Sequence, residues 1–303
     1  MRLAVTALIW LVGAILGIAV VLVASIAIDD AVDGDRIAAI TNAEAPGVAG
    51  GPPVRAYVAR PTQTGPRPVV VMIHEAFGLN STITGKADLL AREGYLVIAP
   101  DTFRGVATSW VPRALYQLMA VRPEAVNADI AAVVAWAKAR PDADPSRVAI
   151  VGFCFGGRAS LMYALHDPSV AATVVFYGNP ETDPNTLKSI TGPLLGIFGG
   201  ADMSISPARV DAFRAGLEGA GVRHRVTVYD GQPHAFVGEA ADVRAGGEPA
   251  KAWAEMVGFL RESLEAPRAS AVDVGRAKAA SIPFSDIVSL AIEHLADRRS
   301  HAH

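Results

Sequence analysis

The chain has 303 residues, enough for one large domain with extensions. Its formal net charge is −3 and its 27 lysine and arginine residues are scattered, which argues against nucleic acid as a partner. Its one cysteine, Cys154, cannot form an intrachain disulfide and excludes a thiolate-rich zinc site.

The N-terminal segment carries no charged residue from Leu3 to Ile28. As a helix it would rise about 39 Å, enough to cross a bilayer core. We predict that residues 1–28 form a transmembrane anchor or uncleaved signal, because a secretory signal has a shorter apolar region. Arg2 precedes the segment and three aspartates follow it, which predicts a cytoplasmic N-terminus and an extracytoplasmic domain. Cleavage at the small residues ending in Ala27 would instead give a secreted protein.

Residues 29–53 are rich in Ala, Gly, Pro and Asp, and are predicted to be a linker. Beyond them, short apolar runs alternate with helical patterns. The predicted strands are Val54–Ala59, Val69–Ile73, Tyr95–Ala99, Val148–Val151, Ala172–Phe176, Leu194–Phe198 and Arg225–Tyr229. The predicted helices are 83–93, 113–120, 125–139, 155–166, 207–219 and 249–264. This alternation predicts an α/β protein with a doubly wound, mostly parallel sheet.

Residues 267–303 follow the last of these helices. Apolar residues at helical spacing, from Ile287 to Leu295, predict a C-terminal helical extension packed on the domain. Contact with a membrane surface or a partner is the weaker alternative, since the opposite face is not strongly basic.

The strongest chemical signal is a glycine-flanked cysteine between a predicted strand and a predicted helix. Cys154 lies between Gly152 and Gly156, in the pattern of a nucleophile elbow with Cys in place of Ser. Such a turn brings backbone segments close together, which glycine permits. The following helix N-terminus favours a thiolate. The alternative is a glycine-rich turn with a structural cysteine.

Two further residues complete the order nucleophile, acid, base that is typical of this turn. Asp202 follows the strand Leu194–Phe198, and His234 follows the strand Arg225–Tyr229. Their order and their places at strand ends predict a triad of Cys154, Asp202 and His234.

The loop after Val69–Ile73 contributes the remaining candidates. In such a site this loop donates one oxyanion-hole N–H, so Ala76 and Phe155 are the predicted backbone donors. Glu75 would then lie near the nucleophile, although a solvated loop glutamate is the alternative.

These motifs together resemble the dienelactone hydrolase family, over about residues 54–266. The matching stretches are HEAFGL at 74–79, APD at 99–101, GFCFGG at 152–157, GGAD at 199–202 and PHAF at 233–236. The resemblance implies an α/β-hydrolase fold and hydrolysis of a cyclic enol-lactone without a cofactor or metal. It also implies that Cys154 attacks the carbonyl, that His234 is the base oriented by Asp202, and that Glu75 helps to generate the thiolate.

The resemblance is less complete at the substrate. Tyr116 is similar to the family's active-site tyrosine, and Phe77 and Phe236 are further candidates for substrate binding. The family has substrate-binding arginines where this chain has Pro112 and Gly238. Arg113 is adjacent to the first of these positions and is a candidate substitute.

The leading interpretation is therefore a membrane-anchored hydrolase of a small-molecule ester or lactone. A general carboxylesterase or thioesterase is the first alternative, and a non-catalytic binding module on the same fold is the second. Binding alone would not require Cys154, Asp202, His234 and Glu75 in these places.

Overall fold

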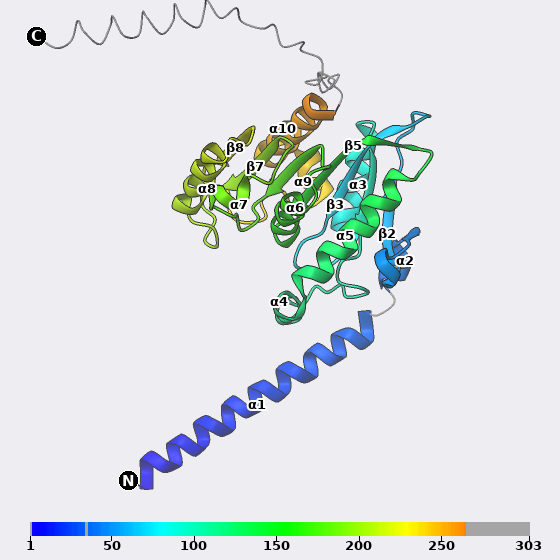
Figure 1. Ribbon diagram of the computed structural model, residues 1–303. Coiled ribbons are helices and arrows are strands. Elements are labelled where there is room, and N and C mark those ends of the chain that lie inside the picture. Colours follow the sequence, from blue (N-terminus) through cyan, green and yellow to red (C-terminus); the bar gives the residue numbers. More distant parts are fainter. Residues whose placement is uncertain (1, 34–35, 265–303) are drawn as a thin grey trace, which may run out of the picture. The chain divides into compact units, whose positions relative to one another are not determined.

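Eight strands form one sheet in the order β1-β2-β4-β3-β5-β6-β7-β8 (Figure 1). The computed structural model describes residues 2–33 and 36–264. The strands are β1 (Ala43–Ala45), β2 (Val54–Ala59), β3 (Arg67–Ile73), β4 (Leu96–Pro100), β5 (Ala143–Phe153), β6 (Ala172–Phe176), β7 (Leu194–Gly199) and β8 (His224–Tyr229). The pairs β1–β2 and β2–β4 are antiparallel and the other neighbours are parallel. The predicted mostly parallel α/β-hydrolase sheet is confirmed.

Helices cover both faces of the sheet (Figure 1). The helices of the described chain are α1 (Arg2–Asp33), α2 (Arg36–Ile40), α3 (Ser81–Arg92), α4 (Val111–Ala120), α5 (Pro123–Lys138), α6 (Phe155–His166), α7 (Pro184–Leu187), α8 (Pro207–Gly219), α9 (Ala240–Ala245) and α10 (Gly247–Leu264), with a 3₁₀ turn at Val48–Gly50. Helices α3 and α10 pack on one face, and α5 and α6 pack on the other.

The central strands are continuous apolar runs because both of their faces are covered. In β3, Val70 and Met72 belong to the core beneath α3 and α10, whereas Val71 and Ile73 belong to the core beneath α5 and α6. All four side chains are fully buried. The carboxyl ends of the parallel strands therefore reach one edge of a rigid, two-sided core.

The segment predicted as a linker, residues 29–53, differs from that prediction. Strand β1 lies within it and pairs with β2, while Ile37 of α2 is fully buried. The Asn42 side chain donates to Val58 O at 3.1 Å and accepts from Val58 N at 2.8 Å. The free edge of β2 thus recruits a short strand that has no apolar periodicity of its own.

Helix α1 contains one stretch long and apolar enough to cross a membrane, Val12–Asp29, with a mean hydropathy of 2.5. Length and composition of this kind suit an anchor and a signal sequence alike. The predicted C-terminal extension, residues 267–303, lies outside the described residues.

Candidate active site

Cys154 lies in a sharp turn between β5 and α6. Its backbone φ is 55°, in the left-handed region that residues with a side chain rarely adopt. Gly152 and Gly156 are required here, because a Cβ on Gly152 would overlap the Gly156 carbonyl and a Cβ on Gly156 would overlap the Ile73 carbonyl. The turn presents Sγ at the N-terminus of α6, where the unpaired amides of a helix stabilise negative charge.

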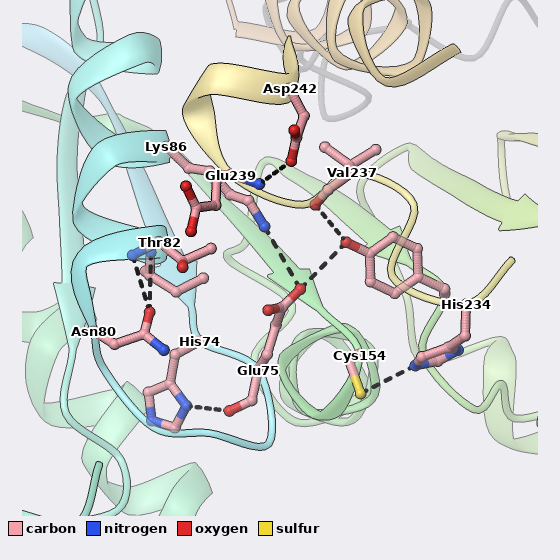
Figure 2. Close-up of polar contacts among 12 residues, drawn as sticks. His74, Glu75, Asn80, Thr82, Lys86, Cys154, His234, Val237, Glu239 and Asp242 are labelled. Carbon is pink, nitrogen blue, oxygen red and sulfur yellow. Dashed lines mark hydrogen bonds and ion pairs between the residues drawn. The ribbon is translucent and has the colours of Figure 1, made fainter. Parts of the chain in front are cut away.

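The structure brings the three predicted triad residues together. His234 Nε2 lies 3.2 Å from Cys154 Sγ (Figure 2). His234 Nδ1 lies 2.7 Å from Asp202 Oδ2. The other oxygen of Asp202 accepts from the backbone N and the hydroxyl of Ser204, each at 2.7 Å. Ser204 thus holds the Asp202 carboxylate in the position from which it orients the His234 ring.

The electrostatics of the site favour a charged imidazole. The hydrogen bond with Cys154 and the contact with Asp202 raise the pKa of His234 to about 9, against the opposing effect of burial. Burial acts to raise the pKa of Asp202, but hydrogen bonds from Ser204 and His234 outweigh it and hold that pKa below its usual value. At neutral pH the His234 ring can therefore hold a proton given up by the thiol.

The loop between β3 and α3 is held from behind by His74, which the sequence analysis did not single out. His74 is fully buried, with Nδ1 2.8 Å from the Glu75 carbonyl oxygen and Nε2 2.8 Å from Thr102 Oγ1. Burial lowers the pKa of His74 to about 4, so the ring is neutral, and Nδ1–H donates to the carbonyl. In a trans peptide the N–H of Ala76 points opposite to the Glu75 carbonyl, so this hydrogen bond also orients the predicted oxyanion donor.

Phe155 supplies the second predicted oxyanion donor at the first position of α6, where a backbone N–H has no partner within the helix. Its ring packs against His74 and Phe103, with centroid distances of 5.9 and 4.8 Å. Phe155 thus packs against His74, the residue that holds the loop carrying Ala76.

The Glu75 side chain extends from beside Cys154 toward Lys86 on α3 (Figure 2). Lys86 Nζ lies 3.5 Å from Glu75 Oε1, and the Tyr177 hydroxyl lies 3.3 Å from the same oxygen. Tyr177 follows β6 and also contacts the His234 ring at 5.2 Å between centroids. Neither Lys86 nor Tyr177 was predicted from sequence.

The structure joins none of the predicted substrate residues of α4 to the triad through a contact among its described residues. Arg113 is buried, its guanidinium 5.4 Å from the centre of the Tyr116 ring, and Tyr116 is about half exposed. Phe236 is buried behind Tyr177, 6.0 Å away between centroids. Phe77 is partly exposed, and its carbonyl accepts from the Thr108 amide.

Within residues 2–33 and 36–264, no group of three or more His, Cys, Asp or Glu side chains is arranged to hold a metal ion.

Comparison with known proteins decides the family. A sequence model of the dienelactone hydrolase family matches residues 54–264. The chain belongs to the dienelactone hydrolase family. It is therefore a hydrolase acting on carboxylic ester or lactone bonds.

Relatives of this dienelactone hydrolase family member cover its catalytic region. A putative carboxymethylenebutenolidase of Escherichia coli strain K12 is 35% identical over 225 residues, covering 68% of this chain and 82% of the relative. One from Methylorubrum extorquens is 32% identical over 226 residues, covering 69% and 77%. The crystal structure of a putative dienelactone hydrolase from Klebsiella pneumoniae superposes with a TM-score of 0.65 at 31% identity, covering 73% of this chain and 98% of that chain.

Proposed function

We propose that this protein hydrolyses its ester or lactone by covalent catalysis, with Cys154 as nucleophile, His234 as base and Asp202 as the residue that orients His234. The observation that carries the proposal is the unbroken series of contacts from Asp202 to His234 to Cys154, at 2.7 and 3.2 Å. Nucleophile, base and orienting acid within hydrogen-bond reach are the signature of nucleophilic catalysis.

The reaction proceeds through a thioester. Cys154 Sγ gives up its proton to the Glu75 carboxylate and attacks the carbonyl carbon, and the carbonyl oxygen takes the electron pair as an oxyanion beside the Ala76 and Phe155 amides. The carbonyl re-forms, the C–O bond to the leaving group breaks, and His234 protonates the departing oxygen. Water, deprotonated by His234, then attacks the thioester, the Cys154 thiolate departs, and Glu75 returns the proton to it.

Pro112 and Gly238 occupy the two positions at which the family carries carboxylate-binding arginines, so neither supplies a cation. An ester or lactone without a carboxylate suits this site better than dienelactone itself. A carboxylesterase or thioesterase remains the alternative with the same mechanism.

We also propose that α1 anchors the enzyme in a membrane, with the catalytic domain on the extracytoplasmic side. The apolar window Val12–Asp29 supports the span, and the positive charge before it supports the orientation. Helix α4 and the residue before it expose large apolar side chains: Trp110, Val111, Leu115, Tyr116 and Met119. Tryptophan and tyrosine among such residues are typical of a surface near lipid headgroups.

The nucleophile is tested with Cys154→Ala against a panel of chromogenic esters and lactones. Turnover should fall to background, because the substitution removes the nucleophilic thiol. The protein should stay folded, because this thiol is small and only partly buried. Ser160→Ala, a similar deletion on the same helix, is the control and should keep its activity. Wild-type turnover by Cys154→Ala would exclude the cysteine mechanism, and inactivity of the native enzyme on every ester and thioester would favour a binding module.

A further inference from the structure

Lys86 is a charged residue in an apolar place. Its side chain is fully buried within α3, and the α3 residues beside it, Ile83, Ala87 and Leu90, belong to the hydrophobic core. Lysine is rarely buried unless it is paired, and an apolar residue of similar volume would avoid the desolvation penalty. Packing alone therefore does not explain a lysine at this position.

The ammonium group faces the catalytic side of the core. Nζ lies 3.5 Å from Glu75 Oε1 and 4.0 Å from the centre of the Phe153 ring, next to Cys154 in sequence. Among the described residues, Nζ has no partner in hydrogen-bonding geometry. The desolvation cost of the buried ammonium group is thus offset electrostatically, chiefly by the Glu75 carboxylate and the face of the Phe153 ring.

The charged and titratable groups around this pair come from five segments. Glu75 belongs to the loop after β3, Cys154 follows β5, Tyr177 follows β6, His234 precedes α9, and Asp242 lies on α9 (Figure 2). Burial lowers the pKa of Lys86, while Glu75, Asp242 and Cys154 oppose that shift. Asp242 is exposed and its carboxylate accepts from the Glu239 amide at 2.7 Å, which leaves Glu75 as the close anion.

We propose that Lys86 is a positioning residue whose ammonium group keeps Glu75 ionised beside Cys154, in the form that can accept the thiol proton. The Tyr177 hydroxyl, 3.3 Å from the same carboxylate oxygen and 3.0 Å from the Val237 carbonyl, holds the carboxylate from the other side. Lys86 acts through Glu75 and does not touch the substrate. The inference rests on the proposed function, since an ionised Glu75 matters only if Cys154 is the nucleophile.

The proton balance gives the expected pH dependence. Accepting the thiol proton requires a carboxylate, so acylation decreases when Glu75 protonates in acid. Without the ammonium, protonation of the carboxylate becomes easier. An opposite charge at this distance is worth about one to three pH units, so the acid limb of the acylation rate should move to higher pH by that amount in Lys86→Met.

The experiment measures single-turnover acylation of the full-length protein by p-nitrophenyl acetate from pH 5 to 9. Where both rates lie on the acid limb, Lys86→Met should acylate about 10-fold or more slowly than wild type at the same pH, and it should approach wild type at high pH. Lys86→Arg keeps the charge and should keep the limb near its wild-type position. The double variant Lys86→Met/Glu75→Gln should match Glu75→Gln alone, because Lys86 then has no carboxylate to act on.

Other outcomes overturn the inference. A uniform loss of rate with an unmoved acid limb would make Lys86 a structural residue only. A further loss in the double variant would show that Lys86 does not act through Glu75. If Lys86→Met fails to fold, Lys86→Gln is read by the same two criteria. Failure of the proposed function is distinguishable, because it appears as turnover by Cys154→Ala. Wild-type acylation by Glu75→Gln would instead overturn the inference, with Cys154 still the nucleophile.

Discussion

Glu75 can assist Cys154 only by accepting the proton of its thiol. A carboxylate near a thiolate disfavours it, since like charges oppose each other's ionisation. The same carboxylate becomes useful when it takes the thiol proton and turns neutral, so that only one negative charge remains in the site. Its side chain is mostly buried, 15% exposed, which makes this difference large.

Glu75→Gln keeps the shape of the side chain and removes its basicity. Single-turnover acylation of Cys154 near neutral pH should become about 10²- to 10⁴-fold slower, as for loss of a general base, while KM changes much less. Glu218→Gln, an exposed position on α8, is the matched control. Equal acylation rates in Glu75→Gln and wild type would show that His234 activates the thiol alone.

Sequence reasoning found the residues that follow strands and missed those that support them. Cys154, Asp202 and His234 each lie within five residues of the end of a predicted strand, in a recognisable order. Lys86 was overlooked because a lysine in a helix is ordinarily read as exposed. Its position gave a usable signal, since Ile83, Lys86, Ala87 and Leu90 share one helical face at the spacing i, i+3, i+4, i+7.

Among the helices and strands, those whose own sequence carries an apolar periodicity could be predicted. Elements that form only through contacts with other parts of the chain could not. Strands β2 and β6 and helices α6 and α8 have the predicted bounds, because their apolar patterns specify them locally. Strand β1 is only Ala43–Ala45 and depends on the edge of β2 for its pairing. Helix α9 has six residues and likewise lacks a clear pattern. Such elements depend on contacts with residues distant in sequence.

The loop between β3 and α3 is held by His74, which is buried and neutral. Burial of a neutral histidine makes the free energy of unfolding depend on pH. In the unfolded chain histidine takes up a proton near pH 6.5, whereas in the folded protein the pKa of His74 is about 4. The contribution of His74 to the free energy of unfolding is therefore fully present above pH 6.5. It is lost as the pH falls toward 4, and the loss is about 3 kcal/mol.

His74→Gln should lack this component, whatever its effect on stability at neutral pH. The measurement is the free energy of unfolding by urea from pH 7 to 4, compared with wild type. Burial raises the pKa of Asp101 to about 6, which acts with the opposite sign and cancels in the comparison because both proteins contain it. His166→Gln, at the exposed C-terminal end of α6, is the control. Parallel curves for His74→Gln and wild type would contradict the neutral, buried histidine.

At the scale of the whole molecule, the folded catalytic domain begins between α1 and the region that matches the family. The family match begins at residue 54, but the folded region begins earlier. Ile37 is buried in the main core and Ala43–Ala45 extends the sheet. A chain shortened to Val54 would lose both and expose the edge of β2, whereas a chain beginning at Arg36 keeps them. A chain that begins at Arg36 therefore removes α1 and keeps the core contact and the edge strand.

The full chain should sediment with membranes and resist extraction by salt, because a span of this length is held by apolar contact with lipid. The chain beginning at Arg36 should be soluble, with kcat/KM for a water-soluble ester within about 2-fold of the full chain, since the triad lies entirely within the retained domain. The chain beginning at Val54 should unfold at a lower temperature, because it loses the buried Ile37 side chain and an edge strand. Sedimentation, N-terminal sequencing and thermal unfolding check these outcomes together. A mature protein that begins near Ile28 and is free in solution would show that α1 is a cleaved signal, and full-chain activity lost on removing residues 1–35 would show that α1 supports the site itself.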